Sequence, residues 1–450
     1  MNLHDWLESH FPTIREDLYT FYRFKTVSAD PNMRPEMDRC ANWLSERLRA
    51  LACHSEVIQT SGAPLVYAED LSAGPQAQTL LIYGHYDVQP IDPIELWKSD
   101  PFEPIEQNGH VYCRGAQDDK GQIFYAITAL TVLRGLNKKL PINLKFLIEG
   151  EEEFGSNALT TALPSLKKKL QADHLLVVDF GIPDAHTPAI SLGARGISTL
   201  EVVLRGSTRD LHSGEFGGIA YNPNRALAEL LAQLWDAQGR IAIPHFYDDV
   251  KQLSPEEKKL FSQGFEEEAI CDLNIKTFAN PKGVSLVESN RLLPSLEING
   301  ISGGYAGPGF KTVIPAEARA KISARIVPNQ DPEKMGHLIG QFLKQHTRVG
   351  LDVEVHYYHG GKPFRAPSDS KLALAVSKAY EELFDRTCQK IVSGASIPVV
   401  ADLKEATGAV VVGMGYGLSS DNIHAPNEHF GLDRFKKGAI TVARTIELLA

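Results

Sequence analysis

Hydrophobic residues in the first part of this chain gather in short runs, each ending at a glycine or an acid. Three such runs are Leu80–Tyr83, Asn143–Ile148 and His174–Val178, and Ala409–Val412 is a fourth near the end of the chain. Short, nearly continuous apolar runs bounded by turn signals are typical of strands buried on both faces. Stretches with helical periodicity, such as Pro35–Leu51, lie beside these runs. The pattern predicts an α/β fold with a mostly parallel sheet.

The pattern changes at Gly193–Gly196. Beyond it, Ile197–Leu204, Ala316–Ile326 and Leu351–Tyr358 alternate apolar and polar residues, as strands of an antiparallel sheet with one exposed face do. We therefore expect an α+β domain inserted into the α/β domain. The predicted ranges are 1–194 and 367–450 for the α/β domain and 195–366 for the insertion.

Composition excludes several classes of protein. The 450 residues are 43% hydrophobic and 23% charged, which is ordinary for a soluble globular protein. The net charge of −10 argues against nucleic acid or an anionic membrane as a partner. No stretch reaches the roughly 18 consecutive apolar residues that span a bilayer, and the first residues fit an amphipathic helix better than a signal peptide. The five cysteines are scattered without CxxC spacing, which favours a cytoplasmic location and excludes a thiolate metal site.

A histidine and an acid follow the run Leu80–Tyr83 directly. His85 and Asp87 are two residues apart, so in extended backbone their side chains lie on the same side. The carboxyl end of a strand is where an open α/β sheet holds ligands, and an acid commonly orients a metal-binding imidazole. A single pair of this kind more often solvates a loop, so its meaning depends on the other segments.

Other segments repeat the pattern. Further ligand-type residues lie past predicted strands or in glycine-rich loops, and these are Asp118, Glu152, Glu153, Asp179 and His424. The carboxyl ends of parallel strands meet at one edge of a sheet, so these residues can converge. Two histidines with several carboxylates suit Zn²⁺, Mn²⁺ or Co²⁺. The acids exceed the needs of one tetrahedral zinc, which favours two metals about 3.5–4 Å apart with a spare acid as general base. Taken singly, each acid run is more typical of a solvated loop or a helix cap.

Five ordered motifs resemble those of a known family. They are GHYDVQP from Gly84, RGAQDDKG from Arg114, EGEEEFGS from Glu149, VVDFG from Val177, and the late His424 followed by Pro-Asn-Glu. They resemble the two-metal peptidases that include aminoacylase, carnosine dipeptidase and succinyl-diaminopimelate desuccinylase, and the resemblance covers essentially the whole chain. DLHSG (Asp210–Gly214), KTVIP (Lys311–Pro315) and SGASIP (Ser393–Pro398) are similar to the cytosolic nonspecific, carnosine-type dipeptidase branch.

The resemblance implies a role for each ligand-type residue. His85 and Asp179 would bind one metal, Glu153 and His424 would bind the other, and Asp118 would bridge them. Glu152 would be the general base, and Asp87 would orient His85. The family pattern makes Glu152 and Glu153 the functional pair and leaves Glu151 as a bystander. His429 is a competing late histidine.

The resemblance also implies a role for the inserted domain as a lid that forms a homodimer. His212 would reach the active site of the partner subunit and stabilise the oxyanion, although a lone surface histidine more often caps a turn. Arg325, Ser396 and Gly394 would bind the substrate carboxylate. For Arg325, an exposed strand charge is an equally good interpretation on the residues alone. Thr312 and His359 are further substrate-binding candidates.

The predicted function is hydrolysis of dipeptides by a metallodipeptidase with two divalent ions, Zn²⁺ or Mn²⁺, with Co²⁺ a further option. An N-acyl-amino-acid deacylase or desuccinylase with the same mechanism is the first alternative. A catalytically inactive binding protein of the same fold is the alternative from another class. No GxSxG elbow is present, which argues against a serine hydrolase.

Overall fold

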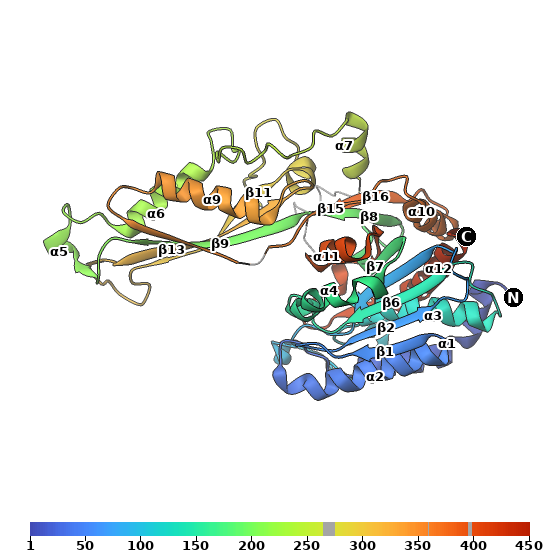
Figure 1. Ribbon diagram of the computed structural model, residues 1–450. Helices are drawn as coiled ribbons and strands as arrows, with labels where there is room; N and C mark the ends of the chain where they lie inside the picture. The colour runs from blue at the N-terminus through green and yellow to red at the C-terminus, as the bar shows by residue number, and fades with distance from the viewer. Residues whose placement is uncertain (264–274, 359, 395–397) are drawn as a thin grey trace. The chain divides into compact units, whose positions relative to one another are not determined.

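A large sheet forms the centre of one part of this computed structural model (Figure 1). The structure describes residues 1–263, 275–358, 360–394 and 398–450. Within these ranges the sheet has nine strands. Their order is β1 (His54–Ile58), β2 (Leu65–Asp70), β6 (Asn143–Glu149), β3 (Thr79–His85), β7 (His174–Gly181), β17 (Val410–Gly417), β8 (Ala189–Ala194) and β15 (Phe364–Arg365), while β16 (Gln389–Ser393) pairs with β8.

The middle of this sheet is parallel. β6, β3, β7 and β17 pair in parallel, whereas β2 on β6 and β8 on β17 are antiparallel. The side chains of Leu80–Tyr83 are fully buried, because helices and neighbouring strands leave no face of β3 exposed. His85 lies opposite Glu149 in the register of β3 and β6, so the carboxyl ends of these strands share an edge. The predicted α/β class with a mostly parallel sheet is confirmed.

Helices cover the sheet. α2 (Arg34–Ala50) packs on β1 and β2, and α3 (Lys120–Gly135) packs on β3 and β7. α3 also contacts α1 (Leu3–Tyr22) and α12 (Leu432–Leu448), which explains why nearly every residue from Lys120 to Leu133 is buried. The remaining helices of this part are α4 (Asn157–Leu170), α10 (Lys371–Phe384) and α11 (Pro398–Thr407).

A second, antiparallel sheet follows the change of pattern near Gly193. Its order is β11 (Ser295–Gly303), β13 (Glu317–Ile326), β9 (Gly196–Arg205) and β14 (Asp352–Tyr357). Burial alternates along β9 and β13, because α6 (Pro223–Leu231) and α9 (Pro332–His346) pack on one face. Smaller elements beside it are β10 (Leu211–His212), α5 (Ser213–Phe216), α7 (Pro255–Phe261) and β12 (Val313–Ile314).

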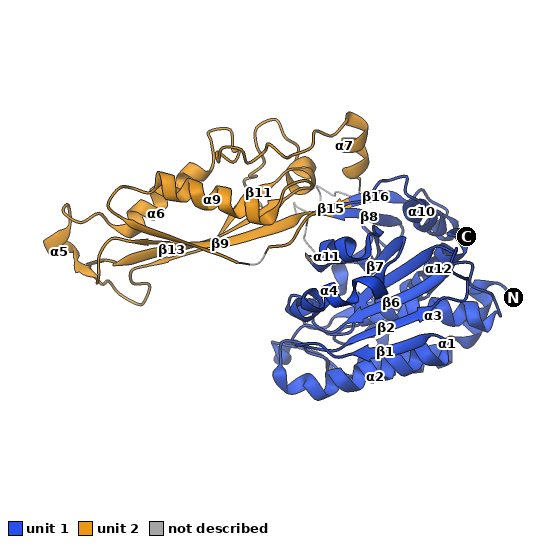
Figure 2. Ribbon diagram, in the orientation of Figure 1, with its two compact units in different colours: residues 1–193, 365–391, 399–450 blue, residues 194–364, 392–398 orange. Residues whose placement is uncertain are grey.

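The chain divides into two compact units (Figure 2). The first unit comprises residues 1–193, 365–391 and 399–450, and the second comprises 194–364 and 392–398. The catalytic and lid roles expected for ranges 1–194, 195–366 and 367–450 stay a prediction. Among the described residues, no helix is both long enough and apolar enough to cross a membrane.

Two elements were not expected from the pattern of residues. β8 is buried along its whole length, yet its residues Ala189–Ala194 include a serine and a glycine that interrupt the apolar run. α11 begins at Pro398, directly after a glycine- and serine-rich segment typical of a loop. In both cases tertiary packing outweighs the local preference.

Candidate metal and catalytic site

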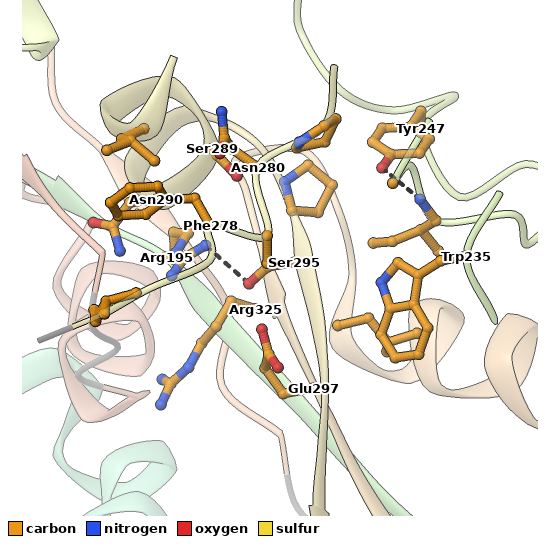
Figure 3. A pocket seen from close by; sticks show the side chains of 18 residues that line it. Arg195, Trp235, Tyr247, Phe278, Asn280, Ser289, Asn290, Ser295, Glu297 and Arg325 are labelled. Atoms are coloured by element: carbon orange, nitrogen blue, oxygen red, sulfur yellow. Dashed lines mark hydrogen bonds between the residues drawn. The ribbon is translucent and has the colours of Figure 1, made fainter. Parts of the chain in front are cut away.

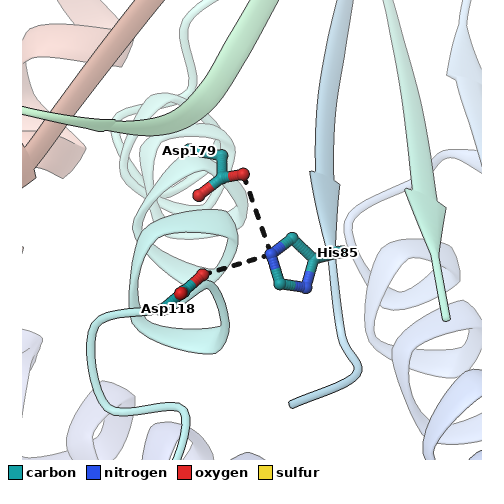
Figure 4. A group of neighbouring side chains, drawn as sticks. All are labelled: His85, Asp118 and Asp179. Atoms are coloured by element: carbon teal, nitrogen blue, oxygen red, sulfur yellow. Dashed lines mark ion pairs between the residues drawn. The ribbon is translucent and has the colours of Figure 1, made fainter. Parts of the chain in front are cut away.

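Three predicted ligands converge at the shared edge of the central strands. His85 ends β3, Asp179 lies near the end of β7, and Asp118 precedes α3. The Nε2 atom of His85 lies 3.3 Å from Oδ1 of Asp118 and 3.8 Å from Oδ2 of Asp179. Figure 4 shows the imidazole facing both carboxylates. One potential ligand atom from each residue lies within 4.8 Å of the others, so the three could hold a metal ion.

A second group shares Asp118 with the first. The Nε2 atom of His424 lies 2.8 Å from Oδ2 of Asp118 and 3.4 Å from Oε2 of Glu153. Asp118, Glu153 and His424 also bring their potential ligand atoms within 4.8 Å of one another. The two oxygens of Asp118 therefore face different histidines, which is the geometry of a carboxylate that bridges two ions.

The donors fit a metal. The side chain of His85 is fully buried, and its Nε2 makes no hydrogen bond within the described residues. A buried nitrogen without a hydrogen bond is costly, yet this one faces two carboxylates that would complete a cation site. Imidazole nitrogens and carboxylate oxygens without thiolates suit a borderline-to-hard divalent ion. The residues present therefore fit metal binding.

Asp87 connects the first histidine to the glutamate pair. Nδ1 of His85 lies 3.1 Å from the backbone oxygen of Asp87 and 3.3 Å from its Oδ1. The same carboxylate accepts hydrogen bonds from the backbone N–H groups of Glu152 (3.2 Å) and Glu153 (3.1 Å). Asp87 thus fixes both the ring of His85 and the start of the short helix Glu152–Phe154.

Crowding of acids shifts the ionisation of this site in the metal-free chain. Burial raises the pKa of Glu152 to about 7, and the nearby carboxylates of Glu153, Asp87 and Asp118 add to this while His85 opposes it. Hydrogen bonds with Asp118 and Glu153 raise the pKa of His424 to about 10. Burial would raise the pKa of Asp118, but hydrogen bonds with the two histidines outweigh it and lower that pKa. A carboxyl with a pKa near neutrality is suited to accept and return a proton.

The predicted oxyanion and substrate-binding residues that the structure describes belong to the second unit. Ser396 and His359 lie outside the described residues. His212 is exposed, and its Nδ1 accepts a hydrogen bond from the N–H of Gly214 at 3.1 Å. Thr312 is also exposed. It lies near His212, because β12 pairs with β10 and the Thr312 carbonyl accepts a hydrogen bond from the N–H of Ser213.

Arg325 lines a pocket of about 610 Å³ in the second unit (Figure 3). Its side chain is half-buried, and burial lowers its pKa. The walls combine the aromatic rings of Trp235 and Phe278 with the carboxylate of Glu297. A guanidinium held in a partly apolar pocket is well suited to bind a carboxylate.

Arg195 is a further residue of this pocket that the sequence pattern did not reveal. It is 7% exposed, and its Nε donates to the carbonyl of Gly394 at 2.8 Å. Burial and the charge of Arg325 lower the pKa of Arg195 to about 10. Arg195 therefore connects the pocket to the loop that carries Gly394. Its only signal in the sequence is a cation between an alanine and a glycine where the hydrophobic pattern changes.

Two other residues of these segments belong to neither metal-ligand group found in the described residues. Asp119 is fully buried, and its Oδ2 accepts a hydrogen bond from the N–H of His85 at 3.0 Å; nothing in the motif distinguishes it from Asp118. His429, the competing late histidine, stacks on Tyr112 and is part of neither metal-ligand group found in the described residues.

Comparison with known proteins identifies the family. The family model described as "Peptidase family M20/M25/M40" matches residues 81–448. The chain belongs to this family. The expected family and the expected class of enzyme, a metallopeptidase, are thereby confirmed.

Named relatives span nearly the whole chain. Human Beta-Ala-His dipeptidase is 34% identical over 430 residues, which cover 93% of this chain and 82% of that protein. The Cys-Gly metallodipeptidase dug1 of Schizosaccharomyces pombe is 29% identical over 434 residues, with coverages of 92% and 90%. Among solved structures, the M20 family metallo-carboxypeptidase Sso-CP2 of Sulfolobus solfataricus superposes with a TM-score of 0.85 at 32% identity, covering 97% of this chain and 99% of that one.

The sharing of Asp118 predicts unequal effects of removing ligands. Asp118→Ala should abolish tight binding of both metals, because this carboxylate belongs to both groups. Asp179→Ala should leave one metal per chain, since the group of Asp118, Glu153 and His424 remains. Metal content after dialysis, measured by mass spectrometry, checks both. Asp184→Ala is the control, because Asp184 is an exposed acid that bonds only locally to His186 and Thr187. Equal metal loss in the Asp118 and Asp179 variants would contradict the sharing.

Proposed function

We propose that this chain is a metallodipeptidase that hydrolyses the amide bond of dipeptides with two divalent ions, Zn²⁺ or Mn²⁺. One observation carries the proposal: Asp118 belongs to two candidate metal-ligand groups at once, and Glu152 directly precedes Glu153 of the second group. The names of the dipeptidases to which the chain is similar support the choice of substrate.

The chemistry divides between ions and side chains. Bound divalent ions would supply Lewis acidity toward the scissile carbonyl and toward water. Glu152 accepts the proton of the attacking water and donates it to the leaving amine. His85 and Asp179 would hold one ion, Glu153 and His424 the other, and Asp118 both. Asp87 holds His85 and the Glu152 backbone in place.

The second unit would bind the substrate. In this proposal Arg325 and the loop of Gly394 and Ser396 hold the free carboxylate of the dipeptide, and Arg195 fixes that loop. Thr312 and His359 are further candidates for contacts with substrate. His212 would stabilise the developing oxyanion in the active site of a partner subunit.

A homodimer through the second unit is part of this proposal. Large apolar side chains are exposed in that unit, notably Ile219 (80%), Ile301 (65%) and Phe310 (102%). Exposed apolar groups of this kind often mark an interaction surface. We also propose a cytoplasmic location, which the four unpaired cysteines in the described ranges support.

A panel of substrates tests the proposed activity. After chelation and reloading with Zn²⁺ or Mn²⁺, the enzyme should hydrolyse free dipeptides and should lose most activity toward the same dipeptides with an amidated C-terminus, because Arg325 then has no carboxylate to bind. Preference for N-acyl amino acids would favour the deacylase alternative. The similarity to a metallo-carboxypeptidase makes longer peptides a necessary part of the panel. No turnover of any substrate by the metal-loaded protein would favour the inactive binding protein.

Replacement of the general base should separate catalysis from metal binding. Glu152→Gln should keep both metals and reduce kcat by about 10²–10⁴-fold, the usual range for loss of a general base. Steady-state kinetics with metal analysis measures both quantities. Glu151→Gln is the matched control, because Glu151 accepts hydrogen bonds from the N–H groups of Ala63 and Ala158 and belongs to neither metal group. Normal turnover in Glu152→Gln, or an equal loss in both variants, would exclude the assignment.

Mixed dimers test whether His212 acts on the partner subunit. His212→Ala and Glu152→Gln should each be inactive alone. A 1:1 mixture that re-forms dimers should recover about a quarter of the wild-type activity, because half of the dimers are mixed and each has one intact site. Native mass spectrometry of isotope-labelled Glu152→Gln mixed with unlabelled His212→Ala measures the fraction of mixed dimers and so controls for subunit exchange. Absence of recovery despite exchange would place His212 outside the catalytic machinery.

A further inference from the structure

A buried carboxylate outside both metal-ligand groups connects the segments that carry them. Glu428 follows His424 by four residues and directly precedes the short strand β18 (His429–Gly431). Its side chain is fully buried. β18 pairs with β5 (His110–Tyr112), so Glu428 lies against the segment that leads to Asp118.

The loop from Arg114 to Asp118 is wrapped around this carboxylate. Oε1 of Glu428 accepts hydrogen bonds from the backbone N–H groups of Gln117 (3.0 Å) and Asp118 (3.1 Å). Oε2 accepts from the backbone N–H of Gly115 (2.8 Å) and from Nη1 of Arg114 (2.8 Å). Both oxygens are therefore occupied by N–H donors, so Glu428 is itself no metal ligand in this geometry.

Arg114 extends the connection to the first histidine. This arginine is 1% exposed, and its Nη2 donates to the carbonyl of Pro90 at 2.9 Å. Pro90 lies in the loop that follows His85, the last residue of β3. The guanidinium lies over the ring of Trp97 at 5.3 Å from its centre, which restricts its movement further. The ion pair of Arg114 and Glu428 thus joins three loops. They are the loop after His85, the loop that contains Asp118 and the loop that contains His424.

We propose that Glu428 is a positioning residue that sets the geometry of Asp118 relative to His424 and so assembles the second metal-ligand group. Its carboxylate fixes the backbone of Asp118 by a direct hydrogen bond, and its own backbone fixes the segment after His424, because the N–H of Cys113 donates to the Glu428 carbonyl at 3.1 Å. The inference rests on the proposed two-metal site.

The test replaces the carboxylate by an amide of the same shape. In Glu428→Gln an NH₂ group faces two N–H donors, so the loop of Asp118 must rearrange. Outer residues that orient metal ligands typically change metal affinity 10–100-fold. We expect the affinity for the second Mn²⁺ to fall by about that factor, with a lower kcat and a nearly unchanged KM. The electron paramagnetic resonance spectrum of the protein with two Mn²⁺ added should change from that of a coupled pair to that of isolated ions.

Controls separate positioning from stability. Asp70 is another buried acid, which pairs with Arg134, accepts from the N–H of Ser72 and belongs to neither ligand group found in the described residues. Asp70→Asn should lower the melting temperature but keep the coupled spectrum. If Glu428→Gln does not fold, Glu428→Asp gives the same measurements with a retained charge and a shorter reach, and a smaller loss of affinity is expected.

The outcomes are distinct. Wild-type affinity for two Mn²⁺ and a coupled spectrum in the folded Glu428 variant would overturn the inference, as would an equal loss of the second ion in Asp70→Asn. Failure of the wild-type protein to bind a coupled pair would instead overturn the two-metal proposal itself, and with it the role of Glu428.

Discussion

The two oxygens of Asp118 face the imidazoles of His85 and His424, which are far apart in the chain, and the fold of the first unit keeps the three side chains together. The difficulty is electrostatic. Asp87, Asp118, Glu152, Glu153 and Asp179 lie close together, and each of these acids is buried or partly buried. Burial raises the pKa of Asp179 well above its ordinary value, and the neighbouring Asp119 and Asp118 carboxylates add to this. Like charges in a buried volume repel each other strongly, so the fold must hold these acids in place against their own repulsion until a cation neutralises them.

Backbone N–H groups and the sheet provide that restraint. The parallel strands β3 and β7 bring His85 and Asp179 to one edge without help from the side chains. The acids in loops are held by hydrogen bonds from the main chain: Asp87 accepts from two N–H groups and Glu428 from three. Charge-assisted hydrogen bonds of this kind stabilise a buried carboxylate. The site is therefore prepared for cations by carboxylates that do not themselves bind them.

The central strands and the residues of the two candidate ligand groups could both be predicted from the sequence, for different reasons. Runs such as Leu80–Tyr83 carry a local signal, and five ordered motifs carry a family signal. Arg195 carries neither signal, because its importance comes from a partner distant in the chain, Gly394. Glu428 ends the motif that begins at His424, but the motif does not reveal its role, which depends on hydrogen bonds with the distant segment of Asp118. The backbone conformation of His424 could not be predicted from the sequence either. Its φ of 58° lies in the left-handed region, which is uncommon for residues other than glycine. β8 was missed because its serine and glycine conceal a buried strand.

The chain passes between the two units four times, since the second unit consists of 194–364 and 392–398. The chain leaves the first unit after β8 and returns to it at β15, and these two strands are neighbours in the large sheet. The N–H of Ala366 donates to the carbonyl of Leu192 at 2.6 Å, so the two ends of the insertion lie side by side. The second unit is thus inserted where two adjacent strands would otherwise meet in a turn, a place at which proteins tolerate whole added domains. All five residues of the two candidate metal-ligand groups belong to the first unit. The insertion of residues 194–364 therefore leaves both candidate ligand groups within the first unit.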